Sequence, residues 1–228
     1  MSLSHEEINA IWLSIKVACW VVITGVIPAI LCAQLLARCS FRGKALVDAL
    51  IHLPLVVPPV VTGYLLIIVL GRNTPMGSLL ETLGLKLAFN WKGAVLASLL
   101  MSFPLMVRSV RLSIEAVDAG LEQAALTLGA SPLKVFLTVT LPLALPGIIS
   151  GSVLGFARSL GEFGATITFV SNIPGETQTL PLALYSFTQT PGGELVAARL
   201  CSISLVIALG ALASSEIIAR HTTRKIRA

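Results

Sequence analysis

Long stretches of apolar residues dominate this chain, and they constrain its fold more than any other feature. A helix needs about 20 mostly apolar residues to cross about 30 Å of membrane hydrocarbon. Charged residues make up only 12% of the chain, about half the share in soluble domains. We therefore expect one all-α transmembrane domain over residues 1–228, a polytopic helix bundle with five spans. The predicted spans are residues 11–36, 45–70, 91–110, 135–157 and 197–217.

A sixth apolar region, residues 165–187, is interrupted by Pro174, Gly175 and Pro181. This broken stretch favours a partly re-entrant segment on the outer side, and a sixth span is the alternative. Prolines also lie inside the predicted second and fourth spans. They free backbone groups that lipid cannot satisfy, so such segments usually pack against protein or line a watery cavity. The pattern favours a bundle with a pathway over a simple anchor, although each proline could also be a packing kink.

Basic residues indicate the orientation of the chain, because short cytoplasmic loops of membrane proteins carry an excess of Lys and Arg. With the N-terminus outside and the C-terminus inside, ten of the sixteen basic residues fall in inner segments. This orientation is therefore the predicted one. The ten residues are Arg38, Arg42, Lys44, Arg108, Arg111, Lys134, Arg220, Arg224, Lys225 and Arg227.

The inner loop at residues 115–134 contains a helix–glycine–helix pattern. Residues 121–128 are mostly good helix formers, and Gly129 is placed to end that helix. Ser131 can cap a second helix that has Pro132 at its favoured first position. Two short helices joined at a fixed angle suit docking into another protein. An ordinary interfacial hairpin is the alternative from the residues alone.

This loop resembles the cytoplasmic motif E-A-A-x3-G-x9-I-x-L-P of permease subunits in binding-protein-dependent ABC importers. Ala124, Ala125, Gly129, Leu141 and Pro142 match it at the right spacing, Val139 replaces Ile, and Gln123 stands at the Glu position, with Glu122 before it. The resemblance implies a cytoplasmic coupling helix that sits on an ATP-binding subunit. The implied coupling residues are Glu122, Gln123, Ala124, Ala125, Gly129, Ala130, Ser131 and Pro132.

Further stretches resemble permeases of oxyanion importers, molybdate above all. They are residues 52–61, 101–108, 156–177, 191–194 and 197–200. The resemblance implies an inner-membrane subunit that moves molybdate inward by alternating access, with a periplasmic N-terminus and a cytoplasmic C-terminus. It also implies a homodimer, two cytoplasmic ATP-binding subunits and an external substrate-binding protein. Tungstate or sulfate/thiosulfate as the transported anion is the first alternative, and a passive anion channel is the second.

The chain is not expected to be an enzyme or to bind a cofactor itself. It has no GxxxxGK[ST] phosphate cradle, so ATP and Mg²⁺ would be used by the partner ATPase. Its three histidines lie far apart, and no metal site is expected. Basic residues are not interleaved with aromatic ones, so nucleic acid is not an expected partner.

Arg158 and Glu162 are the charged candidates for the pathway. Residues four apart on a helix are neighbours, and charges at membrane depth normally find partners. The pair could simply neutralise itself. The functional hypothesis is that Arg158 helps an oxyanion pass, or that Glu162 competes with the anion at a gate. The other pathway or gate candidates are Gly161, Gly164, Thr166 and Thr168.

Asp48 and His52 are also four residues apart, at the inner start of the second predicted span. A local hydrogen bond is the favoured interpretation, and proton coupling is the alternative.

Overall fold

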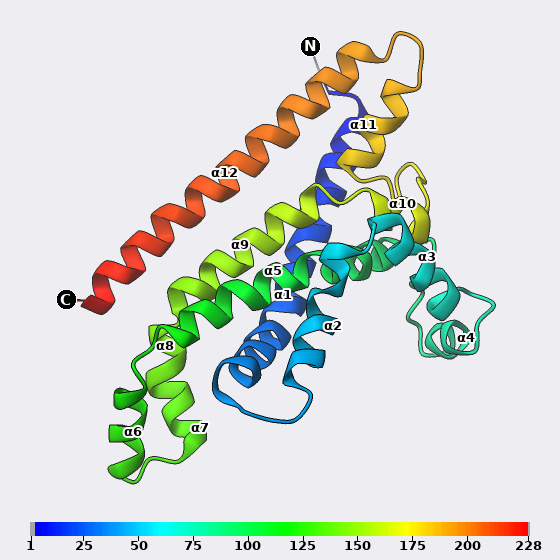
Figure 1. The fold of residues 1–228 in the computed structure, drawn as a ribbon. Coiled ribbons are helices and arrows are strands. Elements are labelled where there is room, and N and C mark those ends of the chain that lie inside the picture. Colours follow the sequence, from blue (N-terminus) through cyan, green and yellow to red (C-terminus); the bar gives the residue numbers. More distant parts are fainter. Residues whose placement is uncertain (1–2, 228) are drawn as a thin grey trace.

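A computed structural model describes residues 3–227, with side chains described for residues 3–214. Within that part of the chain all regular structure is helical, which confirms the all-α fold class. The elements, labelled in Figure 1, are α1 (His5–Arg38), α2 (Lys44–Val56), α3 (Pro59–Leu70), α4 (Pro75–Thr82), α5 (Trp91–Glu115), α6 (Ala119–Thr127), α7 (Pro132–Val135), the π-helix η1 (Phe136–Thr140), α8 (Leu141–Leu143), α9 (Leu145–Leu160), α10 (Gly164–Val170), α11 (Leu180–Thr188) and α12 (Glu194–Arg227).

The first predicted span, residues 11–36, lies inside α1. The helix begins earlier because Ser4 and Glu7 form a capping box: Glu7 N donates to Ser4 Oγ at 3.3 Å, and Ser4 N donates to Glu7 Oε2 at 2.7 Å. A capping box satisfies backbone donors that the first turn would leave unpaired. The apolar run that follows carries the helix to Arg38.

The second predicted span, residues 45–70, is not one straight helix. It consists of α2 and α3, which meet at an angle of 112°. Val57 and Pro58 between them are both extended. The consecutive residues Pro58 and Pro59 explain the break, because a proline disfavours the helical conformation of the residue before it.

The fourth predicted span, residues 135–157, is also bent. The stretch Pro132–Leu143 meets α9 at 68°, at Ala144. Pro146 lies at the start of α9 and has no N–H to donate to a preceding turn, so the helix restarts there. Three helices are long and apolar enough to cross a membrane alone, and five spans result if each bent pair counts as one.

The region considered for a sixth span, residues 165–187, contains the separate short helices α10 and α11. The third and fifth predicted spans, residues 91–110 and 197–217, lie within α5 and α12. Figure 1 shows α1, α5 and α9 crossing at the centre of the molecule, with α12 along one side.

Small and branched side chains form the core between these helices. One cluster joins Val17 and Val21 of α1 to Ala94 and Ala97 of α5, together with Phe169 of α10. A second cluster lies nearer the other end of α1 and α5 and includes Ala29, Ala33, Val107 and Val110. Small residues let helix backbones approach closely, which is how membrane helices pack when no water drives their association.

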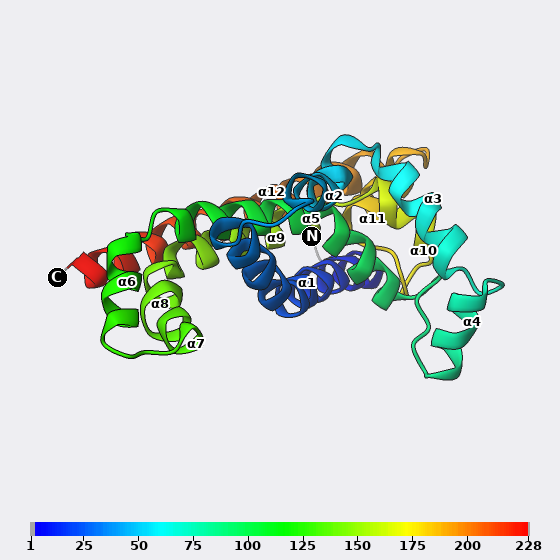
Figure 2. The same cartoon turned by 60° about the horizontal axis from the view of Figure 1, so that its bottom comes forward.

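The two ends of the bundle differ. In Figures 1 and 2, α6 and α7 project from one end, and α12 finishes on that same side. α1 begins beside the first turns of α12, where Glu7 pairs with Arg199, and far from α6.

Candidate functional site

The segment with the helix–glycine–helix pattern folds into two short helices, α6 and α7, that begin and end where its capping residues and Gly129 predict. Asp118 caps α6, and its Oδ1 accepts from Gly120 N at 2.7 Å. Gly129 has a φ of +85°, a left-handed conformation that residues with a Cβ rarely adopt. Ser131 then caps α7, with its Oγ accepting from Lys134 N at 3.4 Å. These local signals fix the angle between α6 and α7.

Apolar side chains face outward on this projection. Leu128 is 88% exposed, and Leu121, Leu126 and Leu133 are also exposed. Apolar side chains exposed together on one projection are a feature of protein–protein contact sites. Of the predicted coupling residues, the exposed ones are Gln123, Ala124, Gly129, Ser131 and Pro132, and the half-buried ones are Glu122, Ala125 and Ala130.

Glu122 points into the chain. Its Oε2 lies 3.1 Å from Arg38 Nε at the end of α1, and its Oε1 accepts from Thr140 Oγ1 at 2.6 Å. No local pattern predicts either contact, because Arg38 is remote in sequence and Thr140 is one hydroxyl residue at the edge of an apolar stretch.

Arg158 and Glu162 form a short ion pair, with 2.7 Å between Arg158 Nη1 and Glu162 Oε2. The two do not share a helix, because α9 ends at Leu160. Glu162 instead lies in the corner before α10, where its Oε1 also accepts from Ala165 N at 2.9 Å. The Glu162 side chain is 1% exposed and that of Arg158 is 29% exposed. The two oxygens of Glu162 therefore contact one guanidinium and one backbone N–H of α10.

The remaining pathway candidates lie around this corner. Thr166 Oγ1 donates to Phe163 O at 2.9 Å, and Thr168 Oγ1 donates to Gly164 O at 2.8 Å, so both hydroxyls are engaged within α10. Gly161 makes no close approach: an added Cβ would find only Arg158 O, at 4.0 Å.

Gly164 brings the two helix breaks together. A Cβ at Gly164 would lie 2.7 Å from Pro59 Cβ, at the start of α3. Gly63, one turn further along α3, is equally close to α10, where a Cβ would meet Ala165 O at 2.6 Å. Gly63 was not among the predicted site residues. The break between α2 and α3 therefore packs against the corner that holds Glu162.

Two further polar residues, Ser159 near this corner and Asn172 just after α10, have buried side-chain atoms. In the described part of the structure, Ser159 Oγ and Asn172 Oδ1 are buried without a hydrogen-bond partner. Asn172 Nδ2 donates to Ser186 Oγ of α11 at 2.7 Å. A buried, unsatisfied polar atom is costly and needs a reason. Hydroxyl and amide groups in an otherwise apolar stretch were the signal available in the sequence.

A charged cavity lies between α2 and α5. It has a volume of about 330 Å³. Arg111 Nη1 donates to Asp48 Oδ1 at 3.1 Å, and Arg111 Nε donates to Glu115 Oε1 at 2.8 Å. His52 Nδ1 lies 2.8 Å from Asp48 O and 3.4 Å from Asp48 Oδ1, which fits the local interaction expected for this pair. Two cations, Arg108 and Arg111, and two carboxylates, Asp48 and Glu115, line this cavity, so their formal charges cancel and leave no net positive charge to hold an anion.

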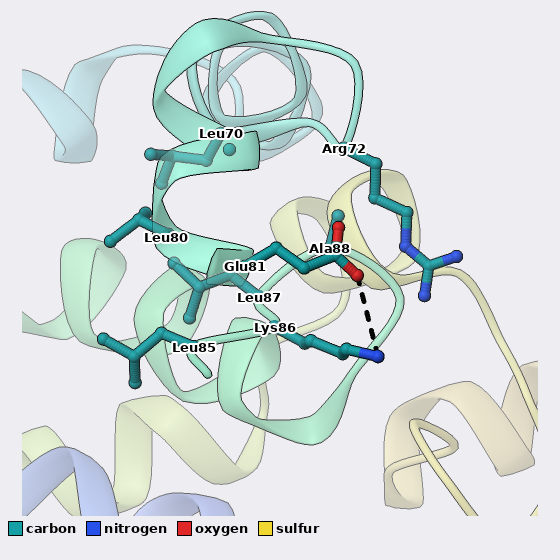
Figure 3. A pocket seen from close by; sticks show the side chains of 9 residues that line it. Leu70, Arg72, Leu80, Glu81, Leu85, Lys86, Leu87 and Ala88 are labelled. Carbon is teal, nitrogen blue, oxygen red and sulfur yellow. Dashed lines mark ion pairs between the residues drawn. The ribbon is translucent and has the colours of Figure 1, made fainter. Parts of the chain in front are cut away.

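Figure 3 shows a second pocket, under α4, where Lys86 Nζ lies 3.6 Å from Glu81 Oε1. Its volume is about 10 Å³, roughly the space for a single water molecule. It is too small for a tetrahedral oxyanion.

The described helices include three that could each cross a membrane, or five spans if each bent pair counts as one, and an apolar helix–glycine–helix projection lies at one end of the bundle. The chain belongs to the family described as "Binding-protein-dependent transport system inner membrane component", whose profile matches residues 25–227. It is thus a transport subunit and not an enzyme.

The most similar proteins found include molybdenum transport permeases. The Molybdenum transport system permease protein ModB of Escherichia coli K12 is 58% identical over 221 residues, which cover 96% of each chain. ModB of Haemophilus influenzae is 57% identical over 221 residues, again 96% of each chain. A bacterial ABC transporter involved in the import of alginate has a similar fold, with a TM-score of 0.77 and 17% identity, over 96% of this chain and 80% of that one. The predicted membership in the family of binding-protein-dependent importer permeases is confirmed.

Proposed function

We propose that this chain forms the membrane pathway of an ATP-driven importer that carries molybdate into the cell. The observation that carries the proposal is the 58% identity to the E. coli molybdenum permease over 96% of both chains. The exposed leucines of the α6–α7 projection supply the second requirement, a surface on which an ATP-binding subunit can dock.

The proposed assembly contains two copies of this chain, two cytoplasmic ATP-binding subunits and an external protein that delivers the anion. ATP and Mg²⁺ are used by the ATP-binding subunits. In this assembly α6 and α7 face the cytoplasm, so the N-terminus, at the opposite end of the bundle, faces the periplasm. The positive-inside pattern of the basic residues supports the same orientation.

The corner between α9 and α10 is the proposed pathway or gate. Arg158 is partly exposed while Glu162 is buried, so the guanidinium is available to an incoming anion from one side. An oxyanion that approaches Arg158 competes with Glu162 for the same donor groups. Weak, shared contacts of this kind suit conduction, because tight binding would stall transit.

Uptake into proteoliposomes tests the proposal. The permease, its ATP-binding subunits and the binding protein are reconstituted together, and accumulation of labelled molybdate is measured with ATP inside the vesicles. We expect ATP-dependent uptake that excess unlabelled molybdate abolishes. Equal uptake without ATP would instead indicate a passive channel. Stronger competition by tungstate or sulfate than by molybdate would reassign the anion.

A further inference from the structure

Arg38, the last residue of α1, joins three segments at the inner end of the bundle. Its Nη2 donates to Ile114 O at 3.1 Å and to Val117 O at 2.9 Å, where α5 ends. Its Nε lies 3.1 Å from Glu122 Oε2 on α6. The last carbonyls of a helix have no partner within the helix, and a cation there also interacts favourably with the helix dipole. Arg38 therefore ties the end of α5 and the first turns of α6 to α1.

Glu122 continues this connection on its other side. Thr140 Oγ1 donates to Glu122 Oε1 at 2.6 Å, and Thr140 is buried in the π-helix η1, which leads into α8 and α9. The two oxygens of one carboxylate thus hold two different elements. The Thr140 contact is a hydrogen bond to a charged acceptor, and such bonds are shorter and stronger than neutral ones. The Arg38 contact is an ion pair in which Arg38 Nε, although 3.1 Å from Glu122 Oε2, lacks hydrogen-bond geometry, so it acts through the attraction of opposite charges.

Along the chain, α6 is joined to α5 and α7 only through short non-helical links. The chain enters α6 through residues 116–118 and leaves it through residues 128–131, where Gly129 has a left-handed conformation. The Arg38–Glu122–Thr140 chain bypasses both links.

We propose that Glu122 is a positioning residue that fastens the coupling helix α6 to α1 and η1. When α6 is displaced, the straight helix α1 and the bent span that contains η1 and α9 then move with it. This inference rests on the proposed function. It assigns Glu122 to the inside of the permease, while the exposed residues of α6 and α7 remain for the ATP-binding subunit.

Two substitutions separate the two contacts. Glu122→Gln keeps an acceptor for Thr140 but removes the attraction to Arg38. Thr140→Val removes the hydroxyl while leaving the ion pair with Arg38 in place. Glu122→Ala removes both contacts. Thr138→Val is the matched control, because Thr138 lies in the same π-helix but is exposed and donates only to Lys134 O.

The measurement is the number of molybdate ions transported per ATP hydrolysed by the assembled importer in proteoliposomes. We expect Glu122→Gln and Thr140→Val each to lower this ratio at least threefold, while the ATP-binding subunits still copurify and hydrolyse ATP. Thr140→Ser should restore the ratio, and Thr138→Val should keep it. Adding Thr140→Val to Glu122→Ala should cost nothing more, because the shared contact is already lost.

A wild-type ratio in both single variants would overturn the inference and leave the proposed function intact. Loss of the copurifying ATP-binding subunits in Glu122→Gln would also overturn it, since Glu122 would then act in docking. A wild-type complex that shows no ATP-dependent molybdate uptake would overturn the proposed function and this inference with it.

Discussion

Glu7 and Arg199, 192 residues apart, form a two-point ion pair that holds the start of α1 against the start of α12. Arg199 Nε donates to Glu7 Oε1 at 2.8 Å, and Arg199 Nη2 donates to Glu7 Oε2 at 2.7 Å. The Glu7 side chain is fully buried and also accepts from Ser4 N. One carboxylate therefore caps the first helix and anchors the last.

Replacing Arg199 with Met should destabilise the protein. Breaking a buried pair leaves an uncompensated charge and typically costs 3–5 kcal/mol, and because Arg199 is 30% exposed we expect about 2 kcal/mol. The measurement is the free energy of unfolding in detergent, from denaturant titration. The control is Lys86→Met, whose ion pair with Glu81 is solvent-exposed and should be worth only about 0–1 kcal/mol. Equal losses in the two variants would contradict this reading of the Glu7–Arg199 pair.

Arg158→Ala should slow molybdate uptake by the reconstituted importer at least tenfold. The substitution removes the only cation in contact with Glu162 in the described structure, and the buried carboxylate is left facing the proposed path. Glu162→Gln should change uptake as well, because it frees Arg158 to hold the anion. Wild-type rates in both variants would remove the pair from the pathway. Size-exclusion profiles of both variants check that the fold is retained.

Gly164→Ala should destabilise the contact between the two helix breaks. The new Cβ would lie 2.7 Å from Pro59 Cβ and 3.4 Å from Val60 N, and such overpacking typically costs about 1–3 kcal/mol. The midpoint of thermal unfolding in detergent reports the loss. Gly210→Ala is the matched control, since nothing lies within 4 Å of a Cβ there. We expect no loss in the control.

Gly129→Pro should abolish copurification with an ATP-binding subunit. Proline fixes φ near −65°, whereas Gly129 has φ +85° and its N–H donates to Leu126 O at 3.0 Å. The angle between α6 and α7 is therefore lost. Gly175→Pro is a comparison at the other end of the bundle, where Gly175 has a similar φ of +79°. An intact complex with the Gly129 variant would show that the α6–α7 geometry is not needed for docking.

Local signals in the sequence predicted much of this structure. The apolar run after Ser4 and Glu7 indicates α1, and Gly129 with Ser131 marks the turn between α6 and α7. These features depend on neighbouring residues, so a single sequence contains the information for them.

The bends and the remote contacts depend on tertiary packing. Prolines mark where a span could break, but they do not specify the 112° angle between α2 and α3, where α10 packs closely against α3 through Gly63 and Gly164. The contacts of Glu7 with Arg199 and of Glu122 with Arg38 join positions with no shared periodicity. A pattern in one stretch of sequence cannot predict such pairs.

The π-helix η1 has a consequence for how the chain tolerates changes in length. Leu141 N donates to Phe136 O, five residues earlier, so this turn contains one residue more than an α-helical turn does. Deleting one residue between Phe136 and Thr140 would restore α-helical winding and keep α7 and α8 in phase. The same deletion within α5 would rotate everything after it by about 100°. The π-helix after α7 is thus a place inside a helical segment where the chain can lose a residue without turning the helices that follow.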